Sequence, residues 1–356
     1  IASILEAEGI STRVIGTLSG ERTTPEAIDL HATLREWVND DVSAVVMEVS
    51  SHALVLHRVD GIMFEVAVFT NIGRDHLDFH KTMEAYFAAK AKLFSFEFAD
   101  LAVINIDDAY GVKLSEITEL PVMTVSRHDQ SATWHFAAIT KDYVGAHVSI
   151  RGSGGILIEG KVHLHGGYNF DNLLMAVAIA TESGIDPIDI AAILPQLTGA
   201  AGRLETVRLG QNFTALVDYA HSPDAVTRVL ETAHEISGGR VIAVLGCGGD
   251  RDASKRALMG KALHEGADVA IFTSDNPRSE KADAILVQMT LGLEIHEPSA
   301  VIEDRADAIR AAVNEAQEGD VVLVLGKGHE KGQEINGTVH PFDDRVELAR
   351  AIEDKK

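Results

Sequence analysis

The sequence predicts an α/β protein of two domains, each built on a mainly parallel sheet covered by helices. Three observations predict this class. The chain has 356 residues, enough for about two ordinary domains with their own cores. Short apolar runs alternate with segments of helical spacing. The segment Gly199-Ala200-Ala201-Gly202 is typical of a hinge, so we place the domains at 1–202 and 203–356.

The composition excludes several classes of partner. Hydrophobic residues make up 46% and charged residues 24% of the chain, as in soluble globular proteins. A formal net charge of -23 argues against sequence-independent binding to nucleic acid or anionic membranes. The single cysteine, Cys247, excludes an internal disulfide and fits a reducing compartment, so we expect a cytoplasmic protein. No apolar run is long enough to span a bilayer.

In the first half of the chain, predicted strands and helices alternate, and a stretch of short β-type runs interrupts this alternation. Strands are expected at 13–17, 44–49, 66–69 and 102–106, and helices at 25–38, 83–94, 170–183 and 186–197. Between Val122 and His165, short β-type runs with turn residues predict a small antiparallel section.

One of these helices places a lysine, Lys90, on its apolar face. Thr82 is the expected N-cap, and Met83, Phe87 and Phe94 recur at helical spacing. Spacing alone favours a lysine whose stem lies on the core while its ammonium reaches water. The other reading is an amine held against the preceding polar loop, with its charge altered or paired there.

Glu48 interrupts the apolar run 45–49, and a buried carboxylate is costly unless it is paired or bound to a cation. Glu48 with His76 is therefore a candidate Mg²⁺ site, although Mg²⁺ usually prefers oxygen and water as ligands. A salt bridge from Glu48 to Arg58 or Arg74 explains the pattern equally well.

The second half restarts the alternation, and polar loops follow three of its strands. Strand-like runs lie at 214–217, 241–245, 268–272 and 321–325. The loops are GCGGDRD at 246–252, SDNPR at 274–278 and GKGHE at 326–330. Loops after the strands of a parallel sheet share one edge, where ligands bind. Their arginines and acids suit a zwitterionic ligand with more than one carboxylate, whereas tight turns alone are the simpler reading.

A series of motifs in chain order resembles the Mur ligases. The motifs are MEVSSHAL with His57-Arg58, FTNIGRDHLDFH, AAK ending at Lys90, DYAHSPD at 218–224, GCGGDRD, DNPR and GKGHE. They cover nearly the whole chain and most closely resemble the members that add meso-diaminopimelate to UDP-N-acetylmuramoyl-L-alanyl-D-glutamate.

The resemblance implies a fold and an activity. The implied fold is a truncated central P-loop-type ATPase-like domain, with a parallel sheet plus a small antiparallel section, followed by a Rossmann-like amino-acid-binding domain. The implied activity is ATP- and Mg²⁺-dependent amide ligation in peptidoglycan synthesis, through an acyl phosphate on the D-glutamate side chain. The diaminopimelate amine then attacks that carbonyl.

The resemblance also implies roles for residues at matching positions. Those implied to hold the UDP-muramoyl peptide are Thr23, Thr24, Ser50, Leu56 and Arg58. Those implied in catalysis and Mg²⁺ binding are Glu48, His76 and Lys90, the last as a carbamate (N6-carboxylysine). Those implied to contact ATP are Asn169, Arg203 and Asp218. Those implied to receive the amino acid are Arg251, Asp275, Asn276, Pro277, Arg278, Gly326 and Glu330. Arg278 is expected to read the distal carboxylate of diaminopimelate, which lysine lacks.

The chain departs from the family pattern in two ways. The family carries a GTNGKT-like phosphate loop just before the helix that begins here at Ile1, and a further N-terminal domain for the uridine end. We therefore expect a fragment with little or no activity by itself. Leu56 stands where relatives often have glutamine near the substrate.

Three alternatives remain at this point. A lysine-adding Mur ligase is disfavoured by Arg278 in DNPR, and a folylpolyglutamate synthetase by DNPR together with GKGHE. The third is a binding protein for a nucleotide sugar or an amino acid without catalysis.

Overall fold

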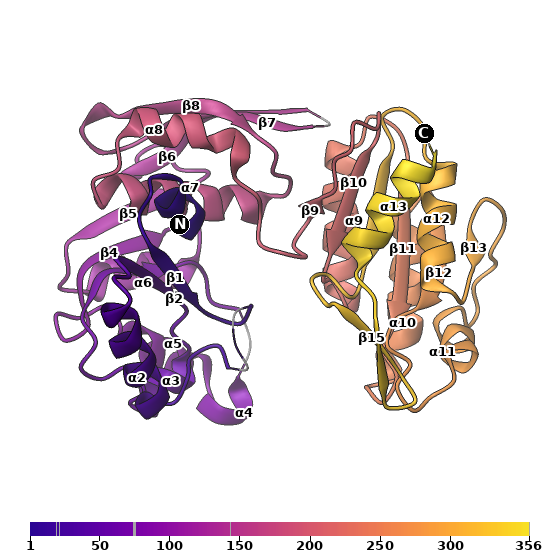
Figure 1. Ribbon diagram of the computed structural model, residues 1–356, viewed down its shortest axis with the longest axis horizontal. Helices are drawn as coiled ribbons and strands as arrows, with labels where there is room; N and C mark the ends of the chain where they lie inside the picture. The colour runs from indigo at the N-terminus through magenta and orange to yellow at the C-terminus, as the bar shows by residue number, and fades with distance from the viewer. Residues whose placement is uncertain (19, 21, 74–75, 143, 356) are drawn as a thin grey trace. The chain divides into compact units, whose positions relative to one another are not determined.

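The computed structural model describes residues 1–355 apart from 19, 21, 74–75 and 143, and it divides into two compact units (Figure 1). Unit 1 comprises 1–140, 147–162 and 167–197. Unit 2 comprises 141–146, 163–166 and 198–356. The domain limits 1–202 and 203–356 stay a prediction.

Unit 1 contains a two-stranded and a six-stranded sheet. The small sheet pairs β1 (Thr12–Ile15) in parallel with β2 (Ala44–Met47). The large sheet has the order β3-β4-β5-β6-β7-β8, with strands at Phe64–Phe69, Ala99–Asn105, Val122–Ser126, Trp134–Asp142, Gly145–Arg151 and Leu157–Val162. β5, which the sequence placed in the antiparallel section, pairs in parallel with both β4 and β6.

Helices follow most strands of unit 1, as the alternation predicted. They are α1 (Ala2–Ala7), α2 (Ala27–Asn39), α3 (Ser51–Val55), α4 (Leu77–His80), α5 (Met83–Ala91), α6 (Ala109–Ile117), α7 (Gly167–Glu182) and α8 (Pro187–Ile193). The predicted cap of α5 is confirmed, because Thr82 Oγ1 accepts from the backbone N–H of Ala85 over 3.1 Å. Tyr86 and Phe87 of α5 pack with Phe69 of β3 in one buried cluster.

Unit 2 is a doubly wound sheet with the strand order β13-β12-β11-β14-β10-β9. The strands are β9 (Glu205–Thr206), β10 (Thr214–Asp218), β11 (Val241–Cys247), β12 (Val269–Ser274), β13 (Ala300–Val301) and β14 (Val321–Leu325). The four predicted strands are confirmed as β10, β11, β12 and β14, which pair in parallel. All their residues are buried, as expected for a parallel sheet covered on both faces.

In the described part of unit 2, five helices cover the two faces of this sheet (Figure 1). They are α9 (Pro223–Ile236), α10 (Ser254–Gly266), α11 (Ala282–Met289), α12 (Arg305–Glu315) and α13 (Asp344–Lys355). The first three share one buried cluster with the sheet, and the last two share another. Among the described residues, no helix is long and apolar enough to cross a membrane.

A short hairpin between β14 and α13 was not predicted. It pairs β15 (Gly332–Ile335) antiparallel with β16 (Thr338–Pro341). Asn336 and Gly337 form its turn with φ values of 49° and 75°. Positive φ at both turn positions is what a tight two-residue hairpin needs, and Asn-Gly supplies it at low cost.

A buried ion pair joins α12 to α13 in unit 2. Arg305 donates Nε and Nη2 to the two carboxylate oxygens of Asp344, each over 2.7 Å, and both side chains are 0% exposed. Asp344→Ala is expected to lower the free energy of unfolding by about 3–5 kcal/mol, because Arg305 would remain charged and unpaired in the core. Urea denaturation measures this loss.

The exposed ion pair between Arg310 and Asp307 on α12 provides the control. Arg310→Ala is expected to change the free energy of unfolding by less than about 1 kcal/mol, because water screens that pair. Equal losses in the two variants would contradict the buried-charge explanation.

Candidate functional site

Thr24 and Ser50 are joined at the end of β2. The Thr24 hydroxyl donates to the backbone oxygen of Glu48 over 2.9 Å and accepts from the backbone N–H of Ser50 over 3.0 Å. Ser50 is the N-cap of α3, and its Oγ accepts from the N–H of Ala53. Two of the predicted peptide contacts therefore lie together on adjacent segments.

Arg58 is tied to the same segment as Thr24. Its Nη1 donates to the backbone oxygen of Thr24 over 3.2 Å, and its Nη2 pairs with Glu26 at 2.6 Å. The side chain is only 15% exposed. Within the described part of the chain, its buried Nε has no hydrogen-bond partner. Arg58 is therefore a cation with a donor still to be satisfied, next to the predicted peptide contacts.

The other two predicted peptide contacts differ in character. Thr23 lies beside Thr17, with 3.0 Å between their Oγ1 atoms. Leu56 is the C-cap of α3 and is 50% exposed, so it can offer a ligand apolar contact only.

Glu48 is exposed, so the prediction that its carboxylate is buried is wrong. The reason is that β2 lies in a two-stranded sheet, which leaves neighbouring Val45 40% exposed as well. Glu48 Oε2 accepts from Thr17 Oγ1 over 2.9 Å. A Cβ at Gly16 would lie 2.5 Å from Glu48 Oε1, so a side chain there would displace the Glu48 carboxylate from this position.

The predicted salt bridge from Glu48 to Arg58 is also wrong, because the guanidinium of Arg58 pairs with Glu26. The alternative partner, Arg74, and its neighbour Asp75 lie outside the described residues.

Tyr86 brings His76 and Lys90 into one neighbourhood. The His76 and Tyr86 rings meet edge to face with centroids 5.7 Å apart, and Lys90 Nζ lies 5.3 Å from the Tyr86 centroid. Burial lowers the pKa of the Lys90 ammonium. Lys90 is thus held beside the polar loop with its charge disfavoured, which supports the second of the two readings of this lysine.

Further histidines surround this pair. The His52 and His76 ring centroids are 5.0 Å apart. His80 is buried, and its Nε2 lies 2.9 Å from Ser51 Oγ. Burial, then the neighbouring His52, His76 and Lys90, lower the pKa of His80. Crowded groups that all gain positive charge on protonation favour an anion or a neutral amine among them.

A magnesium ion would find few protein ligands ready here. In the described ranges, no three His, Cys, Asp or Glu side chains are grouped so as to hold a metal ion. Mg²⁺ commonly keeps several waters and binds one or two carboxylates plus substrate phosphates, so a complete protein cage is not required. A carbamate on Lys90 would add the oxygen ligands that the neutral amine lacks.

In unit 2, Asp218 and Arg203 lie at the carboxyl end of β10. Asp218 is buried, and its Oδ2 accepts from the backbone N–H of Leu204 over 2.8 Å. The Arg203 guanidinium lies 5.3 Å from the centroid of the Tyr219 ring. Asn169, the third predicted ATP contact, is buried in α7 of unit 1.

The fully buried Lys327 fixes two of the predicted amino-acid contacts. Its Nζ donates to Asn276 Oδ1 over 3.0 Å and pairs with Glu330 Oε2 at 3.1 Å. Asn276 Nδ2 donates to the same Glu330 oxygen over 2.8 Å. Sequence reasoning gave Lys327 no role, because a lysine in a glycine-rich loop carries no signal of burial.

Asp275 of the second loop and Gly326 of the third loop lie side by side where these two loops approach each other. Burial raises the pKa of the Asp275 carboxyl, while Arg305 and Lys327 act in the opposite direction. Gly326 has a φ of 111°, and a Cβ there would lie 2.7 Å from Asp275 Oδ2. The loops can therefore approach this closely only with glycine at 326.

Arg278 joins the second loop to the first. Its Nη1 donates to the backbone oxygen of Gly249 over 2.7 Å, and its Nε lies 3.3 Å from Glu334 Oε2. The Arg278 side chain is 23% exposed to solvent, so a ligand can reach it. Arg251 is exposed in the first loop, and Pro277 is buried beside Arg278. The three predicted loops therefore converge at one edge of the sheet.

The unpredicted hairpin also holds the second loop. Gln333 Nε2 donates to the backbone oxygen of Asp275 over 2.7 Å, and the N–H of Glu334 donates to Asn276 Oδ1 over 2.9 Å. The N–H of Arg278 donates to the backbone oxygen of Glu334 over 2.9 Å. Sequence reasoning missed these residues, since Gln333 and Glu334 belong to none of the apolar runs used to find strands.

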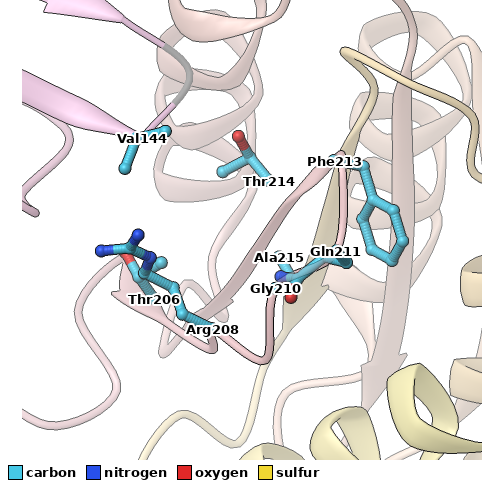
Figure 2. A pocket seen from close by; sticks show the side chains of 8 residues that line it. All are labelled: Val144, Thr206, Arg208, Gly210, Gln211, Phe213, Thr214 and Ala215. Carbon is cyan, nitrogen blue, oxygen red and sulfur yellow. The ribbon is translucent and has the colours of Figure 1, made fainter.

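Two of the cavities formed by the described residues lie within unit 2. The larger, of about 440 Å³, includes Ser274, Pro277 and Gln333 in its wall, directly behind the second loop. The smaller, of about 60 Å³, is lined around β9 and β10 by residues that include Thr206, Arg208 and Thr214 (Figure 2). Its volume suits a few water molecules, and its wall contains none of the predicted ligand contacts.

Comparisons with known proteins agree with the motifs. Residues 1–180 match the Mur ligase middle domain, and residues 202–328 match the Mur ligase glutamate ligase domain. A Streptomyces coelicolor protein named UDP-N-acetylmuramoyl-L-alanyl-D-glutamate–2,6-diaminopimelate ligase is 46% identical over 357 residues, covering 96% of this chain and 71% of that relative. The Aquifex aeolicus protein of the same name is 41% identical, covering 97% of this chain and 72% of its own length.

A solved structure supports the same grouping. A chain described as UDP-N-acetylmuramoyl-L-alanyl-D-glutamate–2,6-diaminopimelate ligase superposes with a TM-score of 0.77 at 36% identity. The match covers 99% of this chain and 74% of that one. The α/β fold, the ordered motifs and these matches together show that the chain belongs to the Mur ligase family.

Proposed function

We propose that this protein joins meso-diaminopimelate to UDP-N-acetylmuramoyl-L-alanyl-D-glutamate at the expense of ATP, in peptidoglycan synthesis. The observation that carries the proposal is the convergence of the three loops of unit 2 around Arg278, Asn276 and Glu330. The names of the relatives support the same reaction.

The loops of unit 2 suit an amino acid that is charged at both ends. The partly exposed guanidinium of Arg278 can bind the distal carboxylate of diaminopimelate through two parallel hydrogen bonds. Glu330, oriented by Lys327 and Asn276, can accept from an ammonium group. L-Lysine would offer Arg278 no distal carboxylate, and sites built for a charged group reject ligands that lack it.

Unit 1 supplies the residues proposed to hold the acceptor peptide. Thr24 and Ser50 are fixed on adjacent segments, and Arg58 lies beside them as a partly buried cation. A carboxylate or phosphate of the nucleotide peptide would satisfy the remaining donor on Arg58.

Lys90 is proposed to act as a carbamate. Burial lowers its pKa and so increases the fraction of neutral amine, which is the form that bonds to CO₂. The nitrogen forms a bond to carbon and loses a proton, so the side chain becomes an anion beside His76, His52 and His80. Mg²⁺, when bound there, would neutralise phosphate charge.

The proposed reaction has two steps. The D-glutamate carboxylate takes the γ-phosphoryl group of ATP, which gives an acyl phosphate and ADP. The amine of diaminopimelate then attacks the acyl carbon, and phosphate and a proton leave. Positioning and charge neutralisation account for most catalysis in reactions of this class.

A ligation assay tests the proposal with the full-length protein, ATP, Mg²⁺ and UDP-muramoyl dipeptide. We expect meso-diaminopimelate to be joined and L-lysine not. A preference for L-lysine would overturn the assignment of the amino acid. If neither is joined although the nucleotide peptide binds, a binding protein without catalysis is the better description.

A further inference from the structure

Arg256 of α10 is a buried cation that links the first loop (246–252) to the segment just after the second loop (274–278). Its side chain is 1% exposed. Nη2 donates to the backbone oxygen of Gly248 over 3.1 Å and to Glu280 Oε1 over 2.7 Å, while Nη1 donates to Glu280 Oε2 over 2.8 Å. Gly248 belongs to the first loop, and Glu280 follows the second loop two residues after Arg278.

Glu280 completes the connection between the loops. Its Oε1 also accepts from the backbone N–H of Asp250 over 2.6 Å. Asp250 in turn accepts from the hydroxyl of Ser279 over 2.6 Å. The hydrogen bonds from Arg256 hold the pKa of Glu280 at about 2, so Glu280 is charged throughout the neutral range.

The loops that this network joins carry Arg251 and Arg278, the two arginines expected to grip the amino acid. They are in close contact, because a Cβ at Gly249 would lie 1.9 Å from the backbone oxygen of Pro277. The N–H of Gly249 also donates to the backbone oxygen of Asn276 over 2.8 Å. A change in either loop would therefore shift the other.

We propose that Arg256 and Glu280 are positioning residues that set the spacing between Arg251 and Arg278, and thereby the affinity for a dicarboxylic amino acid. The inference rests on the proposed function. Neither residue needs to touch the ligand. Added stability alone explains this pair poorly, because desolvation of the buried Arg256 side chain offsets much of its attraction to Glu280.

Steady-state kinetics of the full-length enzyme test the inference through Glu280→Gln and Arg256→Lys. Glu280→Gln keeps the size of the side chain and Arg256→Lys keeps its charge, and each removes the fork of two charged hydrogen bonds. We expect the KM for meso-diaminopimelate to rise about 10- to 100-fold, as misplacement of binding groups does. The KM values for ATP and the nucleotide peptide and the kcat at saturation should stay within about twofold.

Arg240, whose side chain is 34% exposed, provides a control at the opposite end of the strands of the same sheet, just before β11. It donates to Glu315 over 2.7 Å and to Asp320 over 2.9 Å, so it makes a similar network away from the loops. Arg240→Lys and Glu315→Gln should leave the KM for meso-diaminopimelate unchanged, even where thermal unfolding shows a comparable loss of stability.

The outcomes separate the inference from the proposed function. If the wild-type enzyme joins meso-diaminopimelate but the Glu280 and Arg256 variants keep its KM, the inference is wrong and the function stands. A rise in all three KM values, or an equal rise in the Arg240 control, would show a structural role only and would also overturn it. If the wild-type enzyme does not join meso-diaminopimelate, the proposed function and the inference are both wrong.

Discussion

Lys90→Ala is expected to lower the rate of ligation by about 10²- to 10³-fold, the size of effect seen when a group that stabilises transition-state charge is removed. The variant loses the amine that we propose is carbamylated, and with it the oxygen ligands for Mg²⁺. Lys90 points to this role because it is partly buried beside Tyr86 and its pKa is lowered. Initial rates at saturating substrates measure the loss.

Lys92 provides the control for this prediction, because it lies two residues on and is exposed. Lys92→Ala should keep near wild-type activity. Carbon-13 NMR with labelled bicarbonate should show a carbamate signal in the wild type and in Lys92→Ala, but none in Lys90→Ala. Near wild-type ligation by Lys90→Ala would overturn the proposed role.

Arg278→Ala should lower the preference for meso-diaminopimelate over L-lysine by about 10- to 100-fold, the size of one or two charge-assisted hydrogen bonds. The effect should appear in kcat/KM for meso-diaminopimelate, because only this substrate offers a carboxylate to the guanidinium. Competition between the two amino acids in one assay gives the ratio directly.

The exposed Arg228 of α9 serves as the comparison for Arg278. Arg228→Ala removes the same charge from the same unit and should leave the preference intact. If the preference survives in Arg278→Ala, another group reads the distal carboxylate.

The sequence predicted the strands of unit 2 well because each is a continuous apolar run, which suits a strand buried on both faces. It predicted the convergence of the three loops for the same reason, since parallel strands bring their carboxyl ends to one edge. The cap at Thr82 followed from a local rule and is confirmed.

What the sequence could not predict depends on distant pairing. Glu48 was expected to be buried because it interrupts an apolar run, but the run lies in a two-stranded sheet with exposed positions. The hairpin 332–341 lies outside the apolar runs and was missed, although it orients Asn276 and Arg278. Lys327 and Arg256 are buried charges that depend in part on distant partners, Asn276 at 51 and Glu280 at 24 residues, which local patterns do not reveal.

The hairpin turn also determines which asparagine of this protein is most open to slow deamidation. Asparagine deamidates when the next backbone nitrogen attacks its side-chain carbon, and glycine obstructs that attack least. Asn336 precedes Gly337 in the turn, and its N–H donates to the backbone oxygen of Arg278 over 2.7 Å. Asn276 precedes Pro277, whose nitrogen has no hydrogen to lose. Asn276, within the second loop, is thus protected, and we expect deamidation at Asn336, in the turn that contacts Arg278.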